Sequence, residues 1–174
     1  MGVRKLIIVV GKVCSGKDFV ADNVFDNALK IDIGSIVRSL TKTTQRIHQK
    51  TLDIQIIVQV HKAINATDKD VVITGIRQLT IYNNLLLLAS GRRFKQVTYY
   101  LECPLEVLRE RYYKRNNPKD MGIPFEDVIE KDAALGLAEL EQVVLNEPNT
   151  ITININETDA VQKIKEWKGT GVDH

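Results

Sequence analysis

The segment Gly11-Lys-Val-Cys-Ser-Gly-Lys17 constrains the fold of this 174-residue chain more than any other feature. It follows a short, β-branched apolar run over 5–10, which is typical of a buried strand, and it leads into a stretch of helical character. Glycines at this spacing let the backbone turn so that successive N–H groups point into one small hollow. The pattern therefore predicts a strand–loop–helix unit whose loop encloses an anion.

Strands and helices alternate along the rest of the chain. We predict further strands over 29–32, 70–74, 96–101 and 149–154, and helices over 17–28, 33–42, 52–64, 79–90, 104–115, 125–145 and 158–168. Strands separated by helices imply a parallel sheet covered on both faces. With 44% hydrophobic residues the chain can bury one sizeable core. We therefore expect a single α/β domain over 1–174, with a five-stranded parallel sheet and helices on both faces.

In this context the Gly-x-x-x-x-Gly-Lys pattern predicts a Walker A phosphate-binding loop, with ATP as the cofactor. Lys17 would place its charge on the β- and γ-phosphates. The next position usually carries a Ser or Thr whose hydroxyl holds Mg²⁺; here it is Asp18, which either reaches the metal or only caps the helix. The candidate nucleotide-binding residues are Gly11, Lys12, Val13, Cys14, Ser15, Gly16, Lys17 and Asp18, with Ser15 as a second hydroxyl within the loop.

Ligands of parallel sheets bind at the carboxyl ends of the strands, where the second predicted strand ends in Asp32. Asp32 is either a base for a hydroxyl acceptor or the cap of the following helix. The third predicted strand ends in Thr74 and Gly75 and so lacks the acid that many phosphate-loop proteins place there. Binding of a metal then depends on Asp18, Asp32 or water.

The predicted helix over 104–115 carries three arginines near its end. Arg111 and Arg115 are four residues apart and share a face, whereas Arg109 points elsewhere. Guanidinium groups suit phosphoryl transfer because they fork onto phosphate oxygens and stay charged. We therefore favour Arg111 and Arg115 as residues beside a short lid over 116–124, and the alternative is a helix with solvated arginines.

Three segments, 31–38, 72–78 and 101–115, resemble the nucleoside monophosphate kinase-like P-loop kinases, and the resemblance covers most of the chain. It implies that Arg38, Arg77 and Gln78 face the acceptor and that Arg111 and Arg115 lie at the lid. The Gly-Lys-Asp form of the loop is similar to phage-type deoxynucleotide kinases. The placement of an aspartate after the second strand resembles dephospho-coenzyme A kinases, which phosphorylate a hydroxyl.

The stretch over 33–52 contains no acidic residue but carries Arg38, Lys42, Arg46, His48 and Lys50. Together with an aspartate before it and a short lid after it, this stretch resembles phage kinases that phosphorylate 5-hydroxymethyluracil in DNA. The resemblance implies an enzyme that uses ATP and Mg²⁺, with modified DNA as its partner. Its catalytic residues would be Lys17, Asp32, Arg111 and Arg115. A deoxynucleoside monophosphate kinase and a non-catalytic nucleotide-binding module remain alternatives.

Nothing in the sequence indicates a membrane protein. No apolar run approaches the ~18 residues that a membrane span requires. The apolar run over 6–10 is too short for a signal peptide. We expect a cytoplasmic protein, in the host cytoplasm if it is phage-encoded, whose two cysteines, Cys14 and Cys103, are packing residues.

Overall fold

The computed structural model describes residues 3–42, 50–155 and 160–169. Five strands form one sheet in the order β2-β3-β1-β4-β5, and every neighbouring pair is parallel. The strands are β1 (Lys5–Gly11), β2 (Leu29–Asp32), β3 (Val71–Thr74), β4 (Lys95–Glu102) and β5 (Thr150–Asn154). The predicted α/β class and the five parallel strands are confirmed.

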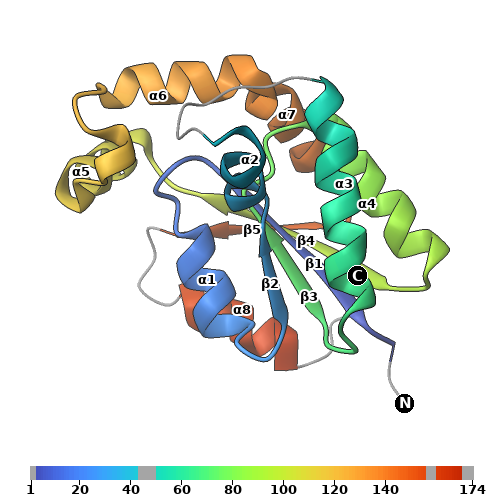
Figure 1. Cartoon of the computed structure of the whole chain (residues 1–174). Helices are drawn as coiled ribbons and strands as arrows, with labels where there is room; N and C mark the ends of the chain where they lie inside the picture. The colour runs from blue at the N-terminus through green and yellow to red at the C-terminus, as the bar shows by residue number, and fades with distance from the viewer. Residues whose placement is uncertain (1–2, 43–49, 156–159, 170–174) are drawn as a thin grey trace.

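Helices cover both faces of the sheet, as predicted (Figure 1). Leu6 and Ile8 of β1 face a core shared with α3 (Lys50–Asn65), α4 (Leu79–Gly91) and α7 (Ala138–Asn146). Ile7 and Val9 face the opposite core, which α1 (Lys17–Val24) and α8 (Ala160–Gly169) cover. Because β1 is buried on both sides, its sequence is a continuous apolar run rather than an alternating one.

Two predicted helices differ from those observed by more than two residues or by an interruption. The helix α1 ends at Val24, four residues before the predicted end at 28, because Phe25 turns into the core and packs against Tyr99 at a ring-centroid distance of 5.7 Å. The predicted helix over 125–145 is divided into α6 (Phe125–Asp132), a π-helical turn η2 (Ala133–Leu137) and α7. Gly136 interrupts it with φ 134°.

The loop over 116–124 joins α5 (Leu105–Arg115) to α6 and contains only the short 3₁₀ turn η1 (Pro118–Asp120). The hydroxyl of Tyr112 lies 2.6 Å from the carbonyl oxygen of Ile123 and 3.1 Å from that of Asp120, and the two oxygens share its single proton. A small cluster of Leu108, Tyr112, Phe125 and Val128 lies beneath this loop. The segment predicted as a short lid is therefore a loop that the Tyr112 side chain of α5 contacts through two backbone carbonyls.

None of the helices within the described residues combines the length and the apolarity of a transmembrane span.

Candidate functional site

A cavity of about 670 Å³ opens at the carboxyl ends of β1, β2 and β3, between the phosphate-loop candidate and the lid. Among the sequence-predicted residues, its lining includes Gly11, Val13, Cys14, Gly16, Lys17, Asp18, Asp32, Arg38, Arg77, Arg111 and Arg115. These residues come from widely separated parts of the chain. The fold therefore brings most of the predicted site residues to one hollow, as the rule for parallel sheets requires.

The loop between β1 and α1 has the backbone of an anion-binding nest. Cys14 and Gly16 have φ of 64° and 96°, so left-handed residues alternate with ordinary ones. The Ser15 N–H donates to the carbonyl of Lys12 at 3.1 Å and tightens the turn. Because α1 begins directly after Gly16, the free N–H groups of its first turn face the same side. This geometry fits the phosphates of ATP.

Lys17 lies across its own loop. Its ammonium group donates to the carbonyls of Gly11 and Lys12, at 2.9 and 2.8 Å. Burial, reinforced by the charge of Arg77, lowers the pKa of Lys17 to about 8, although Asp132, Asp18 and Cys14 act in the opposite direction. The nearby anions do not fully balance the cost of burying this charge. A phosphate group bound beside Lys17 would supply the missing negative charge.

Two side chains of the loop point away from the cavity. The ammonium group of Lys12 pairs with Glu141 of α7 at 2.6 Å, and the hydroxyl of Tyr100 donates to the same carboxylate. Ser15 is 1% exposed and packs against Gly11, where an added Cβ would fall 2.5 Å from its hydroxyl oxygen. Lys12 and Ser15 can therefore serve a nucleotide through their backbone, and the hydroxyl of Ser15 does not line the cavity.

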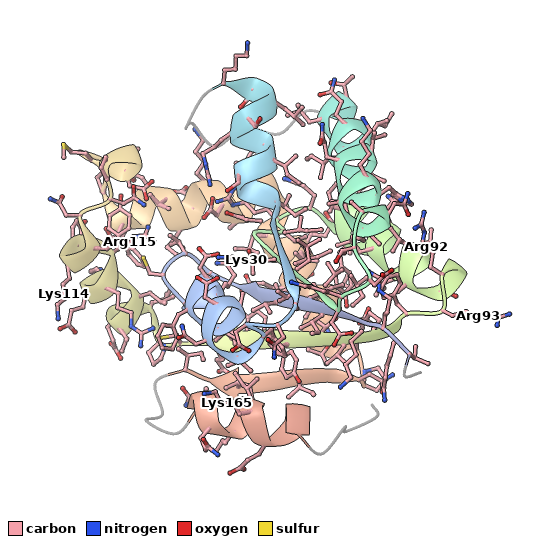
Figure 2. All side chains as sticks on the ribbon, turned by 60° about the horizontal axis from the view of Figure 1, so that its bottom comes forward. Lys30, Arg92, Arg93, Lys114, Arg115 and Lys165 are labelled. Carbon is pink, nitrogen blue, oxygen red and sulfur yellow. The ribbon has the colours of Figure 1, made fainter. Side chains whose placement is uncertain are left out.

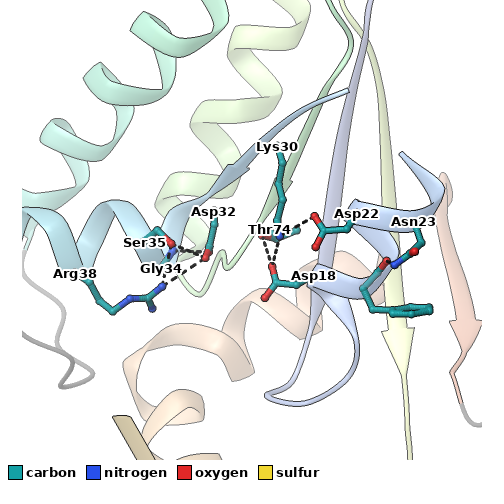
Figure 3. Close-up of polar contacts among 10 residues, drawn as sticks. Asp18, Asp22, Asn23, Lys30, Asp32, Gly34, Ser35, Arg38 and Thr74 are labelled. Carbon is teal, nitrogen blue, oxygen red and sulfur yellow. Dashed lines mark hydrogen bonds and ion pairs between the residues drawn. The ribbon is translucent and has the colours of Figure 1, made fainter. Parts of the chain in front are cut away.

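Asp18 does not cap α1, because the N-cap is Gly16 and no side chain bonds there. Its Oδ1 lies 3.1 Å from the ammonium group of Lys30 and accepts from the hydroxyl of Thr74 at 3.4 Å (Figure 3). Thr74 ends β3, so Asp18 and Thr74 place two hard oxygen donors where the absent third-strand acid would stand.

These oxygens fit a Mg²⁺ ion that is bound largely by nucleotide phosphates and water, since proteins often hold Mg²⁺ through one or two carboxylates only. In the described parts of the chain, no group of three His, Cys, Asp or Glu residues could hold a metal by itself. The ammonium group of Lys30 occupies the same carboxylate oxygen and would have to share it with the ion.

Asp32 caps α2 (Ile33–Thr41): it accepts from the N–H of Gly34 at 3.0 Å and from the hydroxyl of Ser35 at 2.8 Å. The guanidinium group of Arg38 lies 3.6 Å from the same carboxylate (Figure 3). Gly75 permits this arrangement, since it has φ 78° and an added Cβ would fall 2.5 Å from Oδ1 of Asp32. Asp32 therefore caps α2, and its carboxylate also lines the cavity.

The arginines of α5 lie on two sides. Arg111 and Arg115 line the cavity, where Arg111 donates to the Cys14 carbonyl at 3.4 Å and Arg115 lies 3.4 Å from Asp120. Arg109 instead pairs with Glu126 at 2.6 Å and does not reach the cavity. The structure thus separates Arg109 from the pair that the four-residue spacing favours.

The sequence reasoning missed Asp132. Its side chain is 3% exposed, lines the cavity and lies 3.2 Å from the Nε of Arg77. Its sequence context, Phe-Glu-Asp-Val-Ile-Glu-Lys-Asp over 125–132, looks like an ordinary solvated acidic helix. Only its position one turn after the buried Val128 could have suggested a buried acid.

Gln78 lies outside the lining of the cavity, and its amide oxygen faces Gly136. Arg46 and His48 lie outside the described residues, as does the side chain of Lys50. A second basic cluster, Arg92 and Arg93, precedes β4 and therefore lies at the amino end of the sheet. Figure 2 shows it on the opposite side of the molecule from Arg115.

The chain is similar in structure to two solved kinases. One is a gluconokinase from Sinorhizobium meliloti 1021, with a TM-score of 0.61 and 15% identity, covering 98% of this chain and 93% of the other. The second is a sugar kinase from Janibacter sp. HTCC2649, with a TM-score of 0.63 and 15% identity, covering 99% of this chain and 95% of the other. No protein-family model and no curated protein matches the sequence. At this identity the similarity shows the fold alone: the chain shares the α/β fold of these two structures.

Proposed function

We propose that this chain is an ATP-dependent phosphotransferase that phosphorylates a hydroxyl group. The observation that carries the proposal is the position of Asp32. This carboxylate lines the same cavity as the phosphate loop and the lid arginines. A phosphate acceptor is already an anion, whereas a hydroxyl must lose a proton and therefore benefits from a carboxylate base.

The donor half of the site consists of the loop, Lys17 and the α5 arginines. Backbone N–H groups of 11–17 and the ammonium group of Lys17 hold the phosphates of ATP. Asp18 and Thr74 would hold Mg²⁺, which would supply neutralisation of phosphate charge. Arg111 and Arg115 neutralise the phosphoryl group during transfer, since both line the cavity from the lid side.

The acceptor half consists of Asp32, Arg38 and Arg77. The acceptor oxygen forms a bond to the γ-phosphorus while the bond from that phosphorus to the leaving oxygen of ADP breaks, and Asp32 takes the hydroxyl proton. Arg38 and Arg77, which both line the cavity, orient the acceptor. Gln78 belongs to this half only if its amide turns away from Gly136 on substrate binding.

For the acceptor itself we propose the hydroxyl of 5-hydroxymethyluracil in phage DNA. A lid of only nine residues, 116–124, would leave room for a bulky strand, and the acid-free stretch over 33–52 would hold a phosphate backbone through salt-sensitive contacts. The base would have to leave the stack to reach Asp32.

A sugar-type hydroxyl is the second candidate. The observation that favours it is the similarity to structures named as a gluconokinase and a sugar kinase, because such acceptors carry hydroxyls. A deoxynucleoside monophosphate would use Arg38 and Arg77 but would leave Asp32 without a chemical role.

Transfer of label from γ-labelled ATP separates these acceptors. The panel is dTMP, unmodified duplex DNA, the same duplex carrying 5-hydroxymethyluracil, and gluconate. We expect label on the modified duplex and none on the unmodified one. Label on dTMP alone would contradict the proposal that the acceptor is a hydroxyl. Label on gluconate alone would show that the acceptor is a small polyhydroxy compound and not DNA. Absence of any transfer would leave a nucleotide-binding module.

A further inference from the structure

Asp132 is a buried carboxylate on the wall of the cavity that the chemistry above does not use. Its side chain is 3% exposed, whereas that of Arg77, 3.2 Å away, is 27% exposed. Carboxylates are retained in such surroundings only when a cation or several donors compensate them. Arg77 supplies that cation, so the pair connects the interior of the protein to the cavity surface.

A second contact joins the same two segments. The π-helical turn η2 follows Asp132 directly, and its Gly136 lies against the backbone carbonyl of Arg77 and the side-chain amide of Gln78. A Cβ on Gly136 would fall 2.8 Å from the carbonyl oxygen of Arg77, so only glycine permits this approach. The end of α6 and the loop after β3 are therefore fixed to one another both by an ion pair and by backbone packing.

We propose that Asp132 is the positioning residue that holds the guanidinium group of Arg77 toward the acceptor. The inference rests on the proposed hydroxyl phosphotransfer. An arginine side chain loses much rotamer freedom when it binds a substrate, and a buried partner removes that freedom in advance. Misplacement of an orienting group by about 1 Å can cost on the order of 100-fold in rate.

A metal-binding role for Asp132 does not fit the site. Arg77 already compensates its charge. Among the described residues, no group of three His, Cys, Asp or Glu side chains that includes Asp132 could hold a metal ion. Mg²⁺ also prefers carboxylates that leave room for several waters, which a 3%-exposed side chain does not.

The test is a double-mutant cycle with Asp132→Asn, Arg77→Met and the double variant. Steady-state rates are measured with γ-labelled ATP on whichever of dTMP, the modified duplex or gluconate the wild-type protein phosphorylates. For Asp132→Asn we expect kcat/KM for the acceptor to fall about 10- to 100-fold, mainly through a higher acceptor KM. We expect the KM for ATP to stay within about twofold, and the double variant to be no worse than Arg77→Met. Glu130→Gln, an exposed acid on the same helix, is the matched control.

Losses that multiply in the double variant would overturn the proposal, because Asp132 would then act independently of Arg77. A rise in the KM for ATP without a change for the acceptor would place Asp132 on the donor side and also overturn it. If Asp132→Asn does not fold, Arg77→Lys decides: a wild-type acceptor KM would show that a fixed guanidinium is not needed. If the wild-type protein labels no acceptor, the proposed function fails and this inference with it, whereas an active wild type with an additive cycle refutes the inference alone.

Discussion

At the scale of single residues, the affinity of the site for phosphate depends on the contacts and the charge of Lys17. The ammonium group of Lys17 contacts two carbonyls of its own loop, and burial lowers its pKa to about 8. When phosphate replaces those carbonyls, the charged form gains a partner that the empty site lacks. Binding of ATP and protonation of Lys17 are therefore linked, and each favours the other.

This linkage predicts a pH dependence of ATP binding. Below the Lys17 pKa of about 8, the free protein already carries the proton, so protonation of Lys17 does not change the affinity for ATP as the pH varies. Above it the free protein loses a proton that the complex retains, and the affinity falls by up to about tenfold per pH unit. A fluorescent ATP analogue titrated in EDTA from pH 7 to about 9.5 measures it. Lys17→Met should bind more weakly and show no such decline, and a wild-type affinity that stays constant to the end of the range would refute the linkage.

At the scale of elements, the junction between α6 and α7 determines how the wall of the cavity is built. Gly136→Ala should destabilise the fold by about 2–5 kcal/mol, combining backbone strain with overpacking, since φ is 134° and the new Cβ meets Gln78 and the Arg77 carbonyl. Urea denaturation measures the free energy of unfolding. The chain offers two controls: Gly122→Ala has φ 80° but open space and should cost about 1–2 kcal/mol.

The second control, Gly91→Ala, has neither a positive φ nor a close neighbour. It lies at the end of α4 and should be neutral or slightly stabilising, because alanine favours helix over glycine by about 1 kcal/mol. Equal losses at Gly136 and Gly122 would show that backbone strain alone, and not contact with the loop after β3, explains the glycine in η2.

The susceptibility of the lid, 116–124, to proteolysis depends on its contacts with the Tyr112 hydroxyl. Tyr112→Phe removes the hydroxyl whose single proton the carbonyls of Asp120 and Ile123 share, and this loss costs about 1 kcal/mol. We expect faster proteolytic cleavage within 116–124 with little change in the cleavage of the rest of the chain. Tyr99→Phe, a buried tyrosine of β4, is the control. A lid cleaved at the wild-type rate would show that these two bonds do not hold the loop.

At the scale of the whole molecule, the sheet could be predicted from the sequence because short segments rich in β-branched or aromatic residues alternate with stretches of helical pattern. The sequence also indicated the carboxyl ends of β1, β2 and β3 as the site, since Gly11–Lys17, Asp32 and Thr74 follow those strands. It could not indicate Asp132, because burial of a helical acid depends on which segment packs against it. The division of the long helix at Gly136 was missed for the same reason: a lone glycine in a helical pattern is usually tolerated.

The dual role of Asp32 is also a property of the assembled site. The sequence left a choice between a cap and a base, and the structure shows a capping carboxylate that lines the cavity. Asparagine caps helices about as well as aspartate, but it cannot accept a proton. The substitution therefore separates the two roles without disturbing the fold.

Whether Asp32 acts as the base is tested by comparing the wild-type protein with Asp32→Asn, using γ-labelled ATP and the acceptor that the wild type phosphorylates. We expect turnover to fall by at least about 100-fold, while ATP affinity and thermal stability stay close to those of the wild type. Ser35→Ala removes a hydrogen bond to the same carboxylate and should keep most of the activity. Wild-type turnover in Asp32→Asn would show that the acceptor needs no carboxylate base and that Asp32 only caps α2.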